Sequence, residues 1–181
     1  MLPKGLVGVF LLTVFLAMAG AAANEKEAVF RGLFWGDPLD ALEEVISVPL
    51  DEAGVTAYVK RGDRLELGPV PLEWITYDFF QEKLFRITLK FDHSHFTDIL
   101  EMFRVRYGME LETNMIGSHY YWEQNGTSIS LIWPLMRDDY ISFAVFEDMA
   151  GARALALWQR EEDLLEAEQQ AKTKEGGAWD W

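Results

Sequence analysis

Residues 74–90 read WITYDFFQEKLFRITLK, two runs in which apolar and polar side chains alternate on either side of a short polar segment. Alternation with a period of two is typical of β-strands that bury one face. A three-residue loop at 81–83 brings the runs together as an antiparallel hairpin. Its apolar face then pairs Phe79 with Phe85, Tyr77 with Ile87 and Ile75 with Leu89. Its polar face pairs Asp78 with Arg86, Thr76 with Thr88 and Trp74 with Lys90.

The loop length follows from the chemistry of the two faces. A two-residue loop, Gln81-Glu82, would put Asp78 opposite Phe85 and mix apolar with charged side chains, so the alternation favours the longer loop. On the polar face, the position of Lys90 opposite Trp74 predicts a cation–π contact. The hairpin therefore predicts a sheet that buries one face and leaves Trp74 on the other.

Upstream of this hairpin, the mostly apolar residues 28–35 predict a first strand, which Gly36-Asp37-Pro38 ends. Asp37 can cap a helix and Pro38 suits the first helical position, so we expect a short helix next. The apolar face of that helix comprises Leu39, Leu42 and Val45 or Ile46.

The segments 55–60 and 64–67 predict a further hairpin around Arg61-Gly62-Asp63. This triplet also occurs in adhesion motifs. Glycine and aspartate are the residues that any tight turn favours, and we therefore interpret the triplet as a turn.

Downstream, apolar residues at helical spacing predict a helix that ends at Gly108. This stripe comprises Phe96, Ile99, Leu100, Phe103 and Tyr107. Asn125-Gly126 then predicts a tight hairpin turn. The hairpin pairs Trp122 with Ile129 and Tyr120 with Leu131. Its other face comprises His119, Tyr121, Glu123, Ser128 and Ser130.

The last elements are a strand and a long helix. Residues 139–147 alternate and predict a strand, with Ile141, Phe143 and Val145 on a single side. Residues 148–172 predict a helix whose first turns pack on the fold through Ala154, Leu157 and Trp158. Its later turns are acidic and project from the fold.

These elements predict an α+β fold made of two tandem halves, residues 28–91 and 93–147, each a helix plus an antiparallel meander. Each half is too small to bury its sheet face alone, so the two share one core. Residues 24–172 then form a single domain with a long C-terminal helix, and 173–181 form a flexible tail.

Residues 1–23 have the pattern of an export signal. Lys4 precedes an apolar run at 6–18, and small residues follow it. We expect cleavage after Ala23, and cleavage after Ala19 is an alternative. Retention as a membrane anchor is a second alternative, because the apolar run is close to the length that spans a membrane. No cysteine follows the run, which excludes lipoprotein acylation. We therefore expect a periplasmic or secreted protein without stable membrane insertion after cleavage.

Composition excludes several classes of function. The 181 residues contain no cysteine, so disulfides, thiolate metal sites and thiol nucleophiles are absent. With 30 acidic against 16 basic residues, the net charge of −14 repels nucleic acid. The 50% hydrophobic content predicts a packed core. The sequence has no P-loop, dinucleotide fingerprint, EF-hand or G-x-S-x-G pattern, and we expect no cofactor.

Two kinds of residue could carry chemistry. His93 and His95, within Asp92-His93-Ser94-His95, could hold zinc or copper if further ligands came from elsewhere, although Asp92 or Ser94 also fits as the cap of a helix. The many paired carboxylates could serve a glycosidase acting on envelope glycans if two of them faced each other across a cleft. Abundant acids on a solvated surface also account for that second pattern.

Residues 30–38, FRGLFWGDP, resemble the short segment that leads into the helix of SmpA-like bacterial envelope lipoproteins. The tandem order of elements is also similar to that of β-lactamase inhibitory proteins. The chain lacks the lipobox cysteine of the first family and matches no contact residues of the second. The resemblance implies a binding or assembly role. We separately expect no catalytic residues.

Tryptophan placement agrees with that expectation. Trp74 lies on the polar face of its hairpin, and Trp179 and Trp181 follow Gly176-Gly177 near the end of the chain. Aromatic side chains on an acidic surface are typical of partner-binding patches. We expect a non-catalytic envelope protein that binds another envelope protein through Trp74, Trp179 and Trp181. The alternatives are the carboxylate enzyme and a metal-binding protein that uses His93 and His95.

Overall fold

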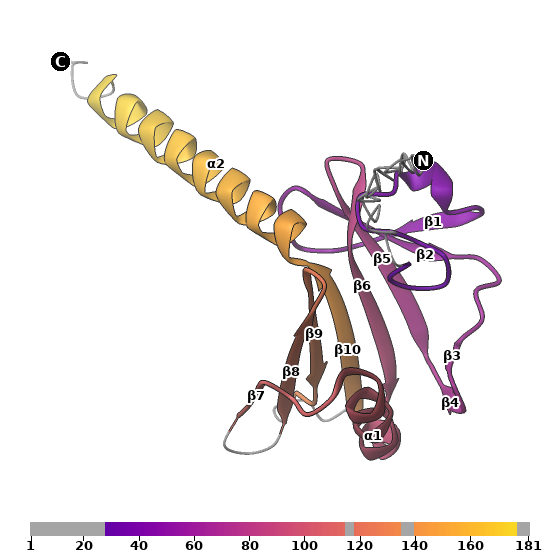
Figure 1. The fold of residues 1–181 in the computed structure, drawn as a ribbon. Helices are drawn as coiled ribbons and strands as arrows, with labels where there is room; N and C mark the ends of the chain where they lie inside the picture. The colour runs from indigo at the N-terminus through magenta and orange to yellow at the C-terminus, as the bar shows by residue number, and fades with distance from the viewer. Residues whose placement is uncertain (1–27, 115–117, 135–139, 177–181) are drawn as a thin grey trace, which may run out of the picture.

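A computed structural model describes residues 28–114, 118–134 and 140–176, and the side chains of these residues up to Thr173. The fold is α+β, with an eight-stranded antiparallel sheet, a helix across one of its faces and a long C-terminal helix (Figure 1). The export signal predicted at 1–23 lies outside the described residues.

The strands of the large sheet are β1 (Val45–Val48), β2 (Val55–Lys60), β5 (Trp74–Phe80), β6 (Lys83–Asp92), β7 (Glu112–Thr113), β8 (His119–Gln124), β9 (Thr127–Ile132) and β10 (Ile141–Asp148). β3 (Glu66–Leu67) and β4 (Val70–Pro71) form a separate small hairpin. The helical elements are η1 (Leu39–Ala41), η2 (His93–His95), α1 (Phe96–Tyr107) and α2 (Met149–Gly176).

The order of the strands joins the two halves of the chain edge to edge. It runs β1-β2-β5-β6-β10-β9-β8-β7, so the first half supplies four neighbouring strands and the second half the other four. β6 and β10 meet at the centre, in a register that pairs Leu89 with Ala144 and Ile87 with Phe146. The two halves therefore build one sheet.

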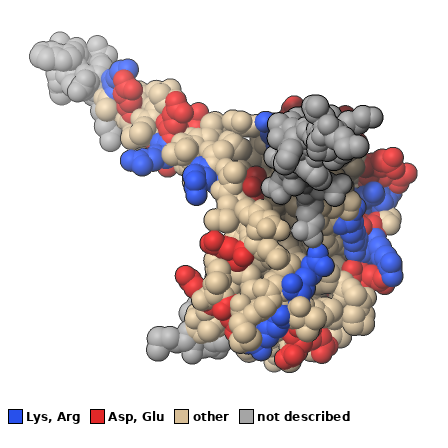
Figure 2. Space-filling view, viewed as in Figure 1, with Lys and Arg blue, Asp and Glu red and all other residues tan. Residues whose placement is uncertain are grey.

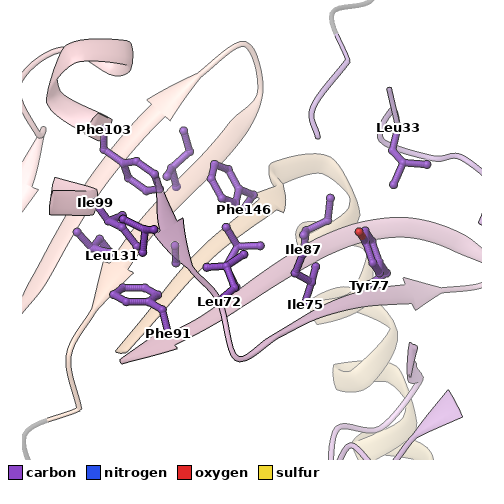
Figure 3. Close-up of a cluster of buried hydrophobic side chains, with 14 of the residues drawn as sticks. Leu33, Leu72, Ile75, Tyr77, Ile87, Phe91, Ile99, Phe103, Leu131 and Phe146 are labelled. Atoms are coloured by element: carbon purple, nitrogen blue, oxygen red, sulfur yellow. The ribbon is translucent and has the colours of Figure 1, made fainter. Parts of the chain in front are cut away.

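One face of this sheet is the core. Buried cross-strand rows run through both halves, such as Ile75, Leu89, Ala144 and Leu131, all at most 2% exposed. Side chains from both halves meet in a single cluster (Figure 3). The shared core is a physical necessity, because neither set of four strands could cover its apolar face alone.

α1 covers the second half of the core face, as the apolar spacing predicts. Phe96, Ile99, Leu100 and Phe103 are buried, and the helix ends at Gly108, whose N–H donates to the carbonyl of Arg104 at 3.0 Å. The first half is covered by the N-terminal segment and the β3–β4 hairpin, which contribute Leu33, Leu42, Val70 and Leu72.

The predicted first strand at 28–35 is wrong. The segment turns back on itself at Arg31 and Gly32, which both have positive φ, and its only strand-like pairing is a bridge between Phe30 and Leu33. The Arg31 guanidinium holds this turn down by donating to Asp63 and to the carbonyl of Glu66, the latter at 2.7 Å. A turn stabilised by the Arg31 side chain therefore lies where the sequence predicted a strand.

The predicted helix after Pro38 is a single 3₁₀ turn. The Asp37 carboxylate accepts from the N–H of Phe34 at 2.8 Å, upstream of the helix, so it does not cap the helix. The chain becomes extended at Leu42, and Val45 and Ile46 belong to β1. The β-branched residues of β1 favour a strand and pair with β2, and this pairing is more favourable than the helix that the sequence predicted.

The predicted pairing of 55–60 with 64–67 is also wrong. β2 lies between β1 and β5, while Glu66 and Leu67 pair with Pro71 and Val70. The interpretation of Arg61-Gly62-Asp63 as a turn fits the structure, in which Gly62 has positive φ. The Asp63 carboxylate is occupied by Arg31 and by the hydroxyl of Tyr77, at 2.6 Å from the latter.

The register of the β5–β6 hairpin is confirmed from Trp74–Lys90 to Asp78–Arg86 and then shifts. Phe79 pairs with Leu84 and Phe80 with Lys83, so the loop is Gln81-Glu82, both with positive φ. A bulge after Asp78 absorbs the odd residue, Phe85, and keeps both faces consistent despite the two-residue loop. The expected pair of Phe79 and Phe85 is therefore wrong: Phe85 is buried on the other side with Phe80 and Leu155.

The β8–β9 hairpin has the predicted register, with Trp122 opposite Ile129 and Tyr120 opposite Leu131. Asp148 starts α2 by accepting from the N–H groups of Ala150 and Gly151. Leu155 and Trp158 pack α2 on the sheet, whereas Ala154 and Leu157 are exposed, which corrects the predicted packing stripe. Every residue from Arg160 to Thr173 is exposed, and this part of α2 projects from the sheet (Figure 1).

Candidate interaction surface

The sheet face opposite the core, which we call the outer face, carries three cross-strand rows of side chains. The first row is Trp74, Lys90, Phe143, Ile132 and His119, on β5, β6, β10, β9 and β8. The second row is Thr76, Thr88, Val145, Ser130 and Tyr121. The third row is Asp78, Arg86, Glu147, Ser128 and Glu123. α2 covers only the corner of this face that lies beyond the third row.

Trp74 is the most exposed aromatic side chain of the first row, at 46%. Its ring receives the Lys90 ammonium at 5.2 Å from the ring centroid, which confirms the predicted cation–π contact. Lys90 also pairs with Glu73 at 2.8 Å. The indole thus contacts the Lys90 cation and still presents apolar surface to solvent.

Phe143 and Ile132 follow Lys90 in the same row across the sheet and are partly exposed. Ile141, Phe143 and Val145 do share one side of β10, as predicted, and that side is the outer face; Ser142, Ala144 and Phe146 are buried on the core side. β10 is apolar on both faces, so alternation alone does not show that an apolar row reaches solvent.

The second row supplies hydrogen-bonding groups beside the apolar row. His119 Nε2 lies 3.2 Å from the hydroxyl of Ser130. The hydroxyl of Tyr121 donates to Glu123 at 2.6 Å, and this hydrogen bond raises the pKa of Tyr121 to about 12. Tyr121 therefore stays protonated at neutral pH, and its ring remains partly exposed.

The third row is an ion cluster around Arg86. Its Nε donates to Asp78 at 2.7 Å, and its other nitrogens contact Glu52 and, at 3.6 Å, Glu147. Burial raises the pKa of Asp78 and of Glu147, and neighbouring Arg86 opposes both shifts. Three carboxylates share one guanidinium at the base of α2, where they fix the end of β10 to the sheet.

The His93 and His95 segment forms a helix start. The Asp92 side chain accepts from the N–H of Ser94 at 2.8 Å, and hydrogen bonding by the side chain and the backbone of Ser94 lowers the pKa of Asp92. His93 stacks on Trp133, with ring centroids 3.9 Å apart, and its Nδ1 lies 3.0 Å from the Ser142 hydroxyl. Within residues 28–114, 118–134 and 140–176, no three His, Asp or Glu side chains are grouped so as to hold a metal ion.

A cavity of about 520 Å³ lies between η1 and β2 on the core side of the sheet. Leu39, Tyr58 and Phe79 supply apolar walls, and the exposed carboxyl residues Asp40 and Glu82 also line it. The cavity is separate from the carboxyl groups of Asp78 and Glu147, which contact Arg86 and have a raised pKa. The arrangement expected of a glycosidase, with a perturbed carboxyl pair in a cleft, is not found in the described part of the chain.

Of the three tryptophans predicted to bind a partner, the structure places one. Trp74 lies on the outer face, and Trp179 and Trp181 lie outside the described residues. The residues that sequence reasoning missed are Phe143 and Ile132, which continue the surface of Trp74. Joining the registers of the two predicted hairpins through the strand at 139–147 would have found them.

Comparison with known proteins gives no assignment. No protein-family model matches the chain, and neither the curated proteins nor the solved structures contain a match to it. Among the described residues, no helix is both long and apolar enough to cross a membrane.

Proposed function

We propose that this protein is a non-catalytic binding or assembly factor of the bacterial envelope, exported to the periplasm or secreted, and that it binds another envelope protein through the outer face. The observation that carries the proposal is the row from Trp74 to His119. It places three partly or largely exposed apolar side chains, Trp74, Phe143 and Ile132, on adjoining parts of one rigid sheet.

The composition of this surface favours a protein partner. An antiparallel sheet commonly leaves one face in water, but that face is then expected to be polar. Here tryptophan, phenylalanine and isoleucine lie beside serine, threonine and tyrosine hydroxyls, the combination of apolar centre and polar surroundings found in protein interfaces. Indole and phenol side chains also lose little conformational entropy on binding.

Rigidity supports the same proposal. Lys90, Phe143 and Ile132 lie on strands that are paired on both sides at these positions, and Trp74 pairs with Lys90 on β6, so the backbone that carries the row is fixed before a partner arrives. A preformed surface avoids part of the entropy loss of association. A few central aromatic side chains usually supply most of the binding energy of such an interface.

Site-specific photocrosslinking in cells tests the proposal. A benzophenone side chain at Trp74 or at Tyr121 reports on the outer face. The same group at Val105, which is 88% exposed on α1 across the sheet, is the matched control. We expect the same protein adduct from positions 74 and 121 and none from 105.

A carbohydrate-active enzyme or a metal-binding protein is not expected to form a protein adduct specifically through the outer face. The absence of any adduct at the two outer-face positions, or an equal adduct at Val105, would contradict the proposal. If an adduct forms, Trp74→Ala should reduce its yield from position 121 by about tenfold, as loss of a central aromatic contact does.

A further inference from the structure

α2 has two apolar sides that point in nearly opposite directions. Leu155, 4% exposed, and Trp158 pack on Phe80 and Phe85, and Gln159 donates to the carbonyl of Ala53 at 3.1 Å. Two residues turn a helix by about 200°, so Leu157 lies on the side away from the sheet. Leu157 is 64% exposed. The packing of α2 on the sheet therefore leaves this second side unused.

The second side continues along the projecting part of the helix. Leu157, Leu164 and Ala171 are exposed and spaced by seven residues, and we call them the α2 stripe. A seven-residue repeat keeps side chains aligned on one side of a helix and is the spacing that a partner helix can follow. None of the described residues covers the stripe.

The projecting part of α2 needs an explanation, because packing supplies most of the stability of helices in proteins. Residues 160–176 extend for about 25 Å. Their side chains are exposed as far as Thr173. Acidic and basic side chains alternate along this part of the surface (Figure 2). A second helix along the stripe would supply the missing packing.

Charges beside the stripe indicate which helix fits. Arg153 lies four residues before Leu157 and Arg160 three residues after it, along one edge of the stripe. Glu161 and Glu168 lie four residues after Leu157 and Leu164, along the other edge. All four are exposed, and Glu168 pairs with Lys172 at 2.6 Å within the helix. One edge is thus basic and the other acidic.

We propose that the α2 stripe binds the α2 stripe of a second copy of this chain, with the two helices parallel. Parallel two-fold pairing brings the basic edge of each helix against the acidic edge of the other, so Arg160 faces Glu161 of the second copy on both sides of the seam. Antiparallel pairing centred on Leu164 would instead bring like edges together and set Glu161 against Glu168 of the second copy.

The position of the sheet permits this arrangement. The sheet packs on α2 through Leu155 and Trp158, on the side away from the stripe. The two sheets of a parallel pair therefore lie on opposite outer sides of the helix pair, and both outer faces stay accessible. Self-association through α2 and partner binding through the outer face use different surfaces.

The seam contains few large side chains, so the dimer should be weak and concentration-dependent. Sedimentation of the protein purified from cells that export the full chain should show a monomer–dimer equilibrium that high salt weakens. Leu164→Glu should weaken it at least tenfold. Leu165→Glu is the matched control, because Leu165 is 47% exposed on the same turn but about 100° away from Leu164.

Charge reversal tests the direction of the helices. Arg160→Glu or Glu161→Arg alone should weaken the dimer, and the double variant should restore it, because each pair is then reversed on both sides. A stronger dimer from Glu161→Arg alone would show antiparallel pairing and overturn the parallel arrangement.

Crosslinking gives an independent readout, because the natural chain has no cysteine. Ala171→Cys, far from the centre of the seam, should form an intermolecular disulfide readily in parallel dimers, and Leu165→Cys should form it slowly. A monomer at all concentrations, or equal loss of dimer from Leu164→Glu and Leu165→Glu, would refute self-association. Neither result would affect photocrosslinking from the outer face.

Discussion

Arg86 donates from Nε to the Asp78 carboxylate at 2.7 Å, across the β5–β6 hairpin and next to the bulge that ends its regular register. Asp78 is only 3% exposed, and its Oδ1 has no hydrogen-bond partner among the described residues. The same guanidinium also serves Glu52 and Glu147. Burial raises the pKa of Asp78, and the nearby charge of Glu52 adds to this rise while Arg86 opposes it.

The sign of the pH dependence follows from that raised pKa. Folded Asp78 binds its proton more tightly than unfolded Asp78, so its contribution to stability is greatest below the unfolded pKa of about 4 and is lost as the pH rises through the folded pKa. Asparagine does not ionise. The free energy of unfolding of Asp78→Asn, relative to wild type, should therefore increase between about pH 4 and about pH 7.

Glu110 provides a control of opposite sign for that experiment. Hydrogen bonds from Arg104 lower its pKa, so its contribution is present above the unfolded pKa and is lost as the pH falls. Glu110→Gln should lose stability relative to wild type over the same rise in pH. Urea unfolding at each pH measures both differences. A pH-independent Asp78→Asn difference would show that the Asp78 pKa is not raised.

Removal of the base should be more damaging than removal of the acid. Arg86→Met leaves Asp78 and Glu147 without their cation, and loss of one partner of a buried pair costs about 3 to 5 kcal/mol. Arg86→Lys retains the charge but not the planar fork, and should cost less. Chemical denaturation measures both, and a loss below about 1 kcal/mol for Arg86→Met would contradict this role for the cluster.

The sequence was informative where local chemistry alone decides structure. The Asn125-Gly126 turn, the α1 stripe and the register from Trp74 to Asp78 depend on neighbours along the chain, and all are confirmed. The alternation of faces also predicted the exposure of Trp74. Of the three apolar side chains on which the candidate surface depends, Trp74 was therefore available before the structure.

The errors arose where distant residues decide. Residues 28–35 have strand composition, but Arg31 is held by Asp63 and by the 64–66 backbone, which no local pattern reveals. The positions of Val45 and Ile46 fit the apolar face of a helix, but in the structure both residues pair with β2. Faces that seemed incompatible with a Gln81-Glu82 loop became compatible through the bulge at Phe85, because a bulge adds one residue without exchanging the faces of the strand.

Phe85 should be important for the seating of α2. It packs with Phe80 and Leu155 and is 2% exposed, so Phe85→Ala should cost about 3 to 5 kcal/mol, as deletions of large buried side chains do. Trp74→Ala, on the same sheet face but 46% exposed, should cost much less. Equal losses in urea unfolding would contradict the assignment of these two residues to buried and exposed positions.

Metal removal should leave stability unchanged. The His93 ring stacks on Trp133 and its Nδ1 lies within hydrogen-bond distance of Ser142, and His95 lies 3.5 Å from Asp98. Among the described residues, neither histidine belongs to a group of three side chains that could hold a metal ion. We expect the same melting temperature with and without EDTA, measured by calorimetry on protein that has not been exposed to added metal. A decrease of several degrees that zinc reverses would favour the metal-binding alternative, because a ligand of the folded state raises its melting temperature.

Gly54 should be intolerant of any side chain. Its φ is +81°, a conformation that costs about 1 to 2 kcal/mol for other residues. A Cβ there would also lie 2.8 Å from Cε3 of Trp158, on the ring that seats α2. Gly54→Ala should therefore reduce the free energy of unfolding by more than its backbone strain alone.

A double-mutant cycle separates the two causes of that loss. In the Trp158→Ala background the steric part disappears and only the backbone part remains, so Gly54→Ala should cost less there, by about 1 to 3 kcal/mol for relief of overpacking. Gly62→Ala is the control, since Gly62 also has positive φ but nothing lies within 4 Å of its added Cβ. Its cost should be the same in both backgrounds. If the cost of Gly54→Ala also stays the same when Trp158 is removed, the indole does not pack over Gly54.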